Sequence, residues 1–357
     1  TTPLEWFDPA SLADCVKDEN GFWKFKTGSL YAPGNEYSCH PKIMDRYESL
    51  QKAGIEPSIP FWINLSFHDH PPLVFWIQHI FIKIFGENNF AFRLPSAILG
   101  LLSVFLIFLI GNKLYGEKTA LFASALLAVT VNHVYISRIG LQEAYVIFLV
   151  LLTLLLFLKS LEKDIYLIWA GASLGMALLF KYTSLIIIPF LLAYIIFRKP
   201  AYLKNAKLWI GGCVAILIFS PVILYNIFLY KYVGHFDFQF SYLFGQDPLI
   251  WQATPGKNIG QLQTRVANFL PWLIATNSWV FLTLVFTSFA TFLYLIFKKT
   301  KLTWSKHGFI FLGLLFFLGL IFFITGPAYR FLTMLTPLLA LSAALIITSV
   351  NEKYATG

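Results

Sequence analysis

Long apolar runs recur along most of this chain, and they constrain its fold more than any other feature. The candidate runs lie at about 90–113, 119–137, 144–161, 166–180, 182–197, 207–229, 271–297, 308–325 and 331–350. Only helices and closed barrels can satisfy the hydrogen bonds of a backbone that crosses lipid. The runs are continuously apolar and do not alternate with polar residues, which favours helices. The sequence therefore predicts an all-α polytopic membrane protein with about nine spans.

The composition supports this class and excludes others. Hydrophobic residues make up 57% of the chain and charged residues 13%, about half the usual charged share of a soluble domain. The net charge of +9 does not come from one basic domain, so nucleic acid is not an expected partner. The chain has no phosphate-binding loop, dinucleotide fingerprint, nucleophile elbow or zincin motif, which argues against a nucleotide cofactor and a hydrolytic site.

Basic residues in the short loops predict the orientation. One set of loops carries Lys113, Lys118, Lys159, Lys163, Arg198, Lys199, Lys204, Lys207, Lys298, Lys299, Lys301 and Lys306. Loops rich in Lys and Arg stay in the cytoplasm. The two long polar segments then lie together on the outer face, which is periplasmic, extracellular or lumenal. We therefore predict four parts: a first outer loop with juxtamembrane helices (1–89), a first part of the bundle (90–229), an outer loop (230–270) and a second part of the bundle (271–357).

The segment at 71–86 is apolar but too short for a comfortable crossing. Gln78, His79 and Lys83 interrupt it, and we interpret it as a helix at the membrane surface. Because the chain opens in polar sequence without Met, we expect an upstream segment to be missing. Cys15 and Cys39 share the first polar segment and could pair in an oxidising compartment.

Ionisable residues at the edge of the membrane are costly, and each one raises a question of function. On the predicted outer side they are Asp8, His68, Asp69, His70, Arg93, Arg138, Glu143, Lys181, His235, Asp237, Arg265 and Arg330. Both signs of charge gather on one face of the predicted bundle. This pattern suits an anionic ligand at the membrane surface, with carboxylates that transfer protons or hold a metal ion.

Several of these residues have two interpretations. The side chains of His68, Asp69 and His70 are suitable ligands for a divalent ion, or they form a polar start to the next helix. Arg93 and Arg330 are either interfacial anchors or phosphate ligands. Arg138 and Glu143 flank one short turn and could pair with each other. Lys181 lies between two apolar runs, where an ammonium group needs an anionic partner.

The motifs at these positions resemble those of a known family. His68-Asp69-His70-Pro71-Pro72-Leu73 is followed, after a short amphipathic run, by Phe90-Ala91-Phe92-Arg93-Leu94-Pro95-Ser96. This combination is similar to the lipid-linked-sugar glycosyltransferases of the GT-C superfamily, and the nearest groups are the protein O-mannosyltransferases and the lipid A aminoarabinose transferases. The resemblance continues to Tyr329-Arg330 and implies a GT-C type bundle whose usual first span is absent from this chain.

The resemblance also implies roles for single residues. Asp8 stands at the position of the family's catalytic Asp, with Pro9 in place of the usual Glu, and Asp14, Asp18 and Asp45 are rival bases. Asp69, with His68 nearby, matches an acidic residue that helps to bind metal. His70 stands where many relatives have Lys. Glu143 matches an acidic position in the second outer loop, whereas Lys181 and Arg330 match basic positions near the lipid phosphate.

These roles imply an inverting glycosyltransferase at the outer face. The donor would be a polyprenyl-phosphate sugar, either undecaprenyl or dolichyl, and the acceptor a hydroxyl or phosphate of a protein, lipid or glycan. The candidate phosphate ligands are Arg93, Arg138, Lys181 and Arg330. The only expected cofactor is an optional divalent ion. His235 and Asp237 lie in a loop that would cover the donor or shape the acceptor site. The relatives suggest a bacterial inner membrane. A transporter or flippase of a lipid-linked sugar is the alternative.

Overall fold

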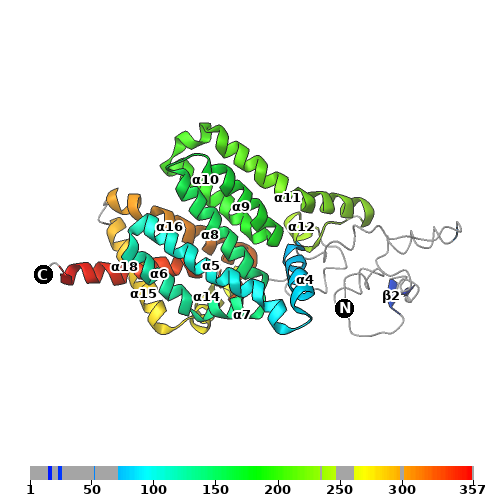
Figure 1. The fold of residues 1–357 in the computed structure, drawn as a ribbon, viewed down its shortest axis with the longest axis horizontal. Helices are drawn as coiled ribbons and strands as arrows, with labels where there is room; N and C mark the ends of the chain where they lie inside the picture. The colour runs from blue at the N-terminus through cyan, green and yellow to red at the C-terminus, as the bar shows by residue number, and fades with distance from the viewer. Residues whose placement is uncertain are drawn as a thin grey trace. The chain divides into compact units, whose positions relative to one another are not determined.

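The structure is a computed structural model that describes residues 15–17, 23–25, 52, 71–233, 235–246, 261–297 and 301–355. Its elements carry the labels of Figure 1. The described chain divides into two compact units. The larger unit contains residues 73–218 and the described part of 259–357, and the smaller one contains the described residues before 73 and between 219 and 258. Asp8, Cys39, His68, Asp69 and His70 lie outside the described residues.

The larger unit is a helical bundle. Its first half contains α4 (Leu73–Phe85), α5 (Asn89–Tyr115), α6 (Glu117–Val129), α7 (Val131–Ile139), α8 (Gln142–Ser160), α9 (Tyr166–Phe180), the 3₁₀ helix η3 (Tyr182–Ile186), α10 (Ile187–Arg198), the 3₁₀ helix η4 (Pro200–Lys204) and the start of α11 (Ala206–Val233). Its second half contains α14 (Leu262–Thr276), α15 (Trp279–Phe297), α16 (Lys301–Leu320), the π-helix η5 (Ile321–Thr325), α17 (Tyr329–Leu332) and α18 (Thr336–Ala355).

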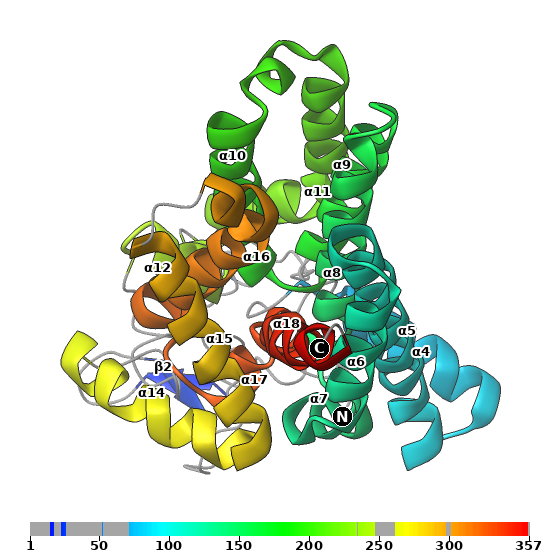
Figure 2. The ribbon, with the colours of Figure 1, turned by 90° about the vertical axis from the view of Figure 1, so that its left-hand side faces the viewer.

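Helix α8 forms the centre of the packed core. It contacts α5 on one side and α9 on the other, and most of its residues are buried. Helix α18 lies between α6 and α15 (Figure 2). Large apolar residues elsewhere, such as Leu101, Leu217 and Phe297, are more than two-thirds exposed on helices, as expected where the surrounding solvent is lipid.

These helices confirm the predicted class, an integral, multi-pass, all-helical bundle. Four described helices are long and apolar enough to span a membrane, and the bent pair α6–α7 could make a fifth. Shorter apolar helices lie at Tyr166–Phe180, Tyr182–Arg198, Trp279–Tyr294 and Thr336–Thr348. The total of about nine spans remains a prediction.

Two of the predicted runs are broken inside. The run at 119–137 bends by 57° between α6 and α7, because Thr130 is extended and its hydroxyl donates to the carbonyl of Leu126. The run at 271–297 is interrupted at Asn277, which is also extended. The Asn277 amide group donates to the carbonyl of Leu273 at 3.0 Å, so a polar side chain satisfies backbone that the helix no longer satisfies.

Glycines bring α9 and α11 unusually close. A Cβ atom on Gly171 would lie 2.0 Å from the carbonyl oxygen of Gly211, and one on Gly175 would lie 2.7 Å from the carbonyl oxygen of Ala215. Small residues four apart allow this kind of backbone contact between helices in lipid. The close contact between α9 and α11 fixes the position of α9, whose last residue, Phe180, comes directly before Lys181.

The smaller unit holds a feature that the sequence did not predict. Strands β1 (Cys15–Lys17) and β2 (Trp23–Phe25) pair antiparallel, with Cys15 opposite Phe25. The pair falls in the segment predicted to be an outer loop, and outside lipid short strands with open edges are tolerated. The described remainder of this unit is the end of α11 and the short helix α12 (Phe238–Leu243).

Candidate functional site

A buried ion pair joins two helix ends in the larger unit. Lys181 follows the last residue of α9, and its extended backbone ends that helix. Glu143 lies in the first turn of α8. The Lys181 Nζ and Glu143 Oε1 atoms are 2.6 Å apart, and the two side chains are only 7% and 2% exposed. Glu143 therefore supplies the anionic partner that Lys181 was expected to need, and it pairs with Lys181 and not with Arg138.

The ion pair of Lys181 and Glu143 satisfies only part of the hydrogen-bonding capacity of its two charged groups. Burying an ammonium or a carboxylate alone costs several kcal/mol, and pairing with good geometry offsets much of this cost. Within the described residues, the second carboxylate oxygen of Glu143, Oε2, is buried and has no hydrogen-bond partner. That oxygen could accept a hydrogen bond from a bound hydroxyl or amine group.

A second cation, the guanidinium group of Arg330, lies beside the same aromatic ring as Lys181. The Lys181 Nζ atom lies 4.9 Å from the ring centroid of Phe331, and the Arg330 guanidinium carbon lies 5.0 Å from the same centroid. An aromatic face attracts cations when water is excluded. The ammonium group of Lys181 and the guanidinium group of Arg330 therefore both lie beside the Phe331 ring, and cations of these two kinds are suitable ligands for a phosphate.

Neighbouring helices fix the short segment that carries Arg330. The Asn132 amide group donates to the carbonyl of Tyr329 at 2.9 Å, and the rings of Tyr135 and Tyr329 meet edge to face. On the other side, Arg265 donates to the carbonyl of Phe322 in η5. Single-turn π-helices are frequent at functional sites. Asn132 and Phe331 were not among the site residues predicted from the sequence, although Asn132 is a polar residue inside an apolar run.

The other predicted phosphate ligands lie at exposed positions. Arg93 is in the first part of α5 and Arg138 in the last turn of α7, and both are exposed. Their roles as phosphate ligands remain predictions from the sequence.

His235 and Asp237, in the smaller unit, have structural partners. The Asp237 carboxylate accepts a hydrogen bond from the Phe240 backbone at 2.8 Å and so caps α12. It also accepts from the Asn226 amide group at 3.0 Å. The His235 Nδ1 atom lies 2.6 Å from the carbonyl of Phe236. These contacts explain why both side chains are buried, and a role in the site remains a prediction.

No group of three metal-ligating side chains occurs in the part of the chain that the structure describes. The predicted metal ligands Asp69 and His68, the neighbouring His70 and the predicted base Asp8 all fall outside that part. Their roles are therefore expectations from the sequence.

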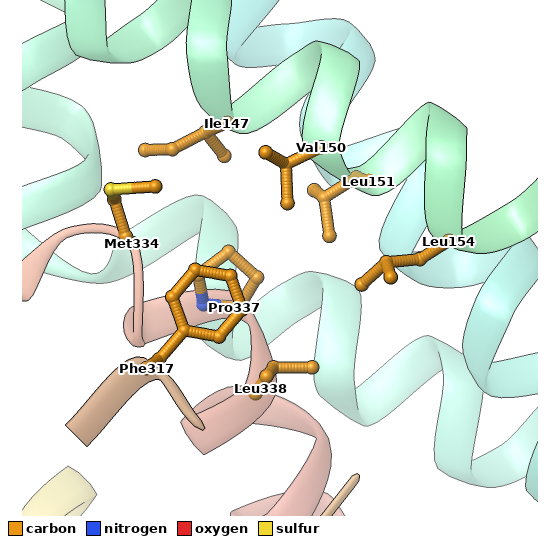
Figure 3. A pocket seen from close by; sticks show the side chains of 8 residues that line it. All are labelled: Ile147, Val150, Leu151, Leu154, Phe317, Met334, Pro337 and Leu338. Carbon is orange, nitrogen blue, oxygen red and sulfur yellow. The ribbon is translucent and has the colours of Figure 1, made fainter. Parts of the chain in front are cut away.

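A small apolar cavity of about 10 Å³ lies in the packed interior (Figure 3). Its lining includes Ile147, which follows Glu143 by one turn of α8, and Met334, which follows Arg330 by four residues. A cavity of this size holds one water at most, and apolar walls favour a dry one.

These features define the class: an integral, multi-pass helical membrane protein with a buried ion pair and a second cation on a shared aromatic ring. Residues 69–225 match the family model for dolichyl-phosphate-mannose-protein mannosyltransferases. This range contains α4 to most of α11, with both members of the ion pair.

Three similar proteins extend this match. YycA of Bacillus subtilis (strain 168), a provisionally assigned mannosyltransferase, is 31% identical over 163 residues, which are 45% of this chain and 23% of YycA. An undecaprenyl phosphate-alpha-4-amino-4-deoxy-L-arabinose arabinosyl transferase of Pseudomonas savastanoi pv. phaseolicola is 38% identical over 68 residues, which are 19% of this chain and 13% of the relative. The structure of ArnT from Cupriavidus metallidurans bound to undecaprenyl phosphate aligns with a TM-score of 0.58 at 16% identity, covering 83% of this chain and 53% of ArnT.

The comparisons confirm the predicted resemblance to GT-C glycosyltransferases, and the fold is of the GT-C type. The match covers only 23% and 13% of the length of these two curated relatives and 53% of ArnT.

Proposed function

We propose that this chain is a membrane glycosyltransferase that moves a sugar from a polyprenyl-phosphate donor to an acceptor hydroxyl or phosphate of a protein, lipid or glycan. The observation that carries the proposal is the buried pair of Lys181 and Glu143, with Arg330 against the same aromatic ring as Lys181. The family match across the pair and the likeness to a structure that binds undecaprenyl phosphate support it.

The two cations would hold the donor phosphate. The phosphate gains negative charge as the sugar leaves, and positioned cations in a water-poor site stabilise that charge. Glu143 would keep the Lys181 ammonium in place before the donor arrives. The donor is already activated, so the reaction requires no nucleotide.

The remaining steps rest on residues outside the described part of the chain. Asp8 would act as the base that takes the proton from the acceptor. A single base with in-line displacement predicts inversion at the anomeric carbon, unlike the paired carboxylates of retaining hydrolases. Asp69 and His68 would hold a divalent ion if one is needed.

The location of the site is also part of the proposal. The clusters of Lys and Arg in the opposite loops support a cytoplasmic assignment for those loops. The ends of α9 and α7 near Lys181 and Arg138 would then face the periplasm or the cell exterior of a bacterial inner membrane. The four predicted parts of the chain follow from the same orientation.

Sugar release from a panel of polyprenyl-phosphate sugars tests the function. We would measure it with the chain in lipid nanodiscs and compare the wild type with Asp8→Asn. Release by the wild type, and its loss in a folded Asp8→Asn variant, would support the transferase and its base. Equal release by both would keep the enzyme class and move the base to Asp14, Asp18, Asp45 or Asp69. Donor binding without release from any donor would favour the flippase.

A further inference from the structure

Gln78 is a polar residue on the buried face of the short helix α4. Val74 and Gln78 are the buried residues of α4, and Gln78 is 3% exposed. The opposite face shows Trp76, Ile80 and Ile84, each at least half exposed. An amide group in such a place needs a hydrogen-bond partner, because an unsatisfied buried polar group costs about 1–3 kcal/mol.

The partner of Gln78 is the turn that leads to the ion pair. Its Nε2 atom donates to the carbonyl oxygen of Gly140 at 2.7 Å, across 62 residues of sequence. Gly140 ends α7 in the left-handed conformation, at φ +82°. The ring of Phe92 occupies the space that a Cβ atom of Gly140 would need, at 2.7 Å. The turn is therefore held from two sides, by α4 and by α5.

This turn sets the start of α8. Gly140 and Leu141 separate α7 from α8, and Glu143 is the second residue of α8. A displacement of the turn would move the Glu143 carboxylate, and the Lys181 ammonium depends on that carboxylate at 2.6 Å. Charge pairs at such short distances are sensitive to shifts of a fraction of an ångström.

We propose that Gln78 is a positioning residue: by tethering α4 to the carbonyl of Gly140, it places Glu143 and hence Lys181 for the donor phosphate. The proposal rests on the function proposed above. It also links the ion pair to the membrane, because the exposed face of α4 combines Trp76, Ile80 and Ile84 with His79 and Lys83, and such a mixed face suits the lipid interface. A shift of α4 at that interface would reach the ion pair through this hydrogen bond.

The test replaces Gln78 by methionine, which has a similar volume and no donor. Hydrogen exchange of the backbone amides at 139–145 reports the tether without any ligand. We expect about tenfold faster exchange at this turn in Gln78→Met, the effect of losing one buried hydrogen bond. Thr283→Val is the matched control, because Thr283 is exposed on α15 and its hydroxyl donates within its own helix. Unchanged exchange at the turn in Gln78→Met would overturn the proposal.

A binding measurement separates positioning from a loss of folding. We expect Gln78→Met to raise the Kd for undecaprenyl phosphate about tenfold. The same change should have less than about a twofold effect in a Glu143→Leu/Lys181→Met background, where nothing remains to be positioned. Equal effects in both backgrounds would refute the positioning role. If Gln78→Met does not fold, Gln78→Leu, which is also uncharged and has no donor, is tested in the same way. Failure of the wild type to bind undecaprenyl phosphate would reject the proposed function and leave the exchange result valid.

Discussion

Replacing Lys181 by methionine leaves the Glu143 carboxylate buried without its cation. The side chain of Glu143 is 2% exposed, and its Oε1 atom lies 2.6 Å from the Lys181 ammonium. Its other oxygen has no hydrogen-bond partner among the described residues. Removing one member of a buried pair costs about 3–5 kcal/mol, because the remaining charge is not compensated. We expect Lys181→Met to lower the free energy of unfolding by this amount.

Two comparison variants make this prediction specific. Glu143→Leu/Lys181→Met removes both charges and should recover most of the lost stability, since apolar replacement of a buried pair is often neutral. Lys113→Met breaks the pair with Glu162, whose side chain is 71% exposed. That exposed pair contributes little in water, so its loss should have a much smaller effect.

The assay is denaturant unfolding in lipid nanodiscs, followed by tryptophan fluorescence. The reasoning would be refuted if Lys181→Met were no less stable than Lys113→Met. It would also be refuted if the double variant were less stable than Lys181→Met, because the cost would then not arise from the remaining carboxylate.

Two further predictions concern packing and pH. Gly171→Ala should lower the free energy of unfolding by about 1–3 kcal/mol, because the added methyl group would meet the carbonyl of Gly211. Gly212→Ala is the control in the same unfolding assay and should be tolerated, because its methyl group would meet nothing within 4 Å. The hydrogen bond from Lys113 holds the pKa of the Glu162 carboxyl group below its ordinary value. The pair therefore stabilises the fold at any pH above the pKa that Glu162 has in the unfolded chain. This stabilisation is lost as the pH falls through the lower pKa of Glu162 in the folded protein. The stability difference between the wild type and Glu162→Gln should shrink in acid and in high salt, and a difference that grows in acid would contradict this assignment.

Hydropathy was enough to predict the class and most helices, because lipid demands long apolar helices. It could not predict the bend at Thr130 or the break at Asn277. A window average does not register one extended residue whose side chain satisfies the neighbouring carbonyl. The β1–β2 pairing also left no clear signal, since two strands of three residues are too short for a pattern.

The site was partly predictable for a similar reason. Lys181 and Glu143 attracted attention as charges near an apolar environment, and their isolation correctly indicated that Lys181 needed an anion. Their pairing depends on how α8 and α9 pack, 38 residues apart in sequence. Gln78 looked like an interruption of an apolar run, and only the structure shows its partner, Gly140. The role of Phe331 was hidden because an aromatic residue is common in such a chain.

The binding of undecaprenyl phosphate tests the central claim most directly. We would measure its Kd in lipid nanodiscs for the wild type and for Glu143→Leu/Lys181→Met, which removes both charges and is expected to keep the fold. Hydrogen bonds to a charged group contribute about 1.5–3 kcal/mol. The account predicts a Kd at least tenfold higher in the double variant. An unchanged Kd would contradict it, because the phosphate would then be held without Lys181.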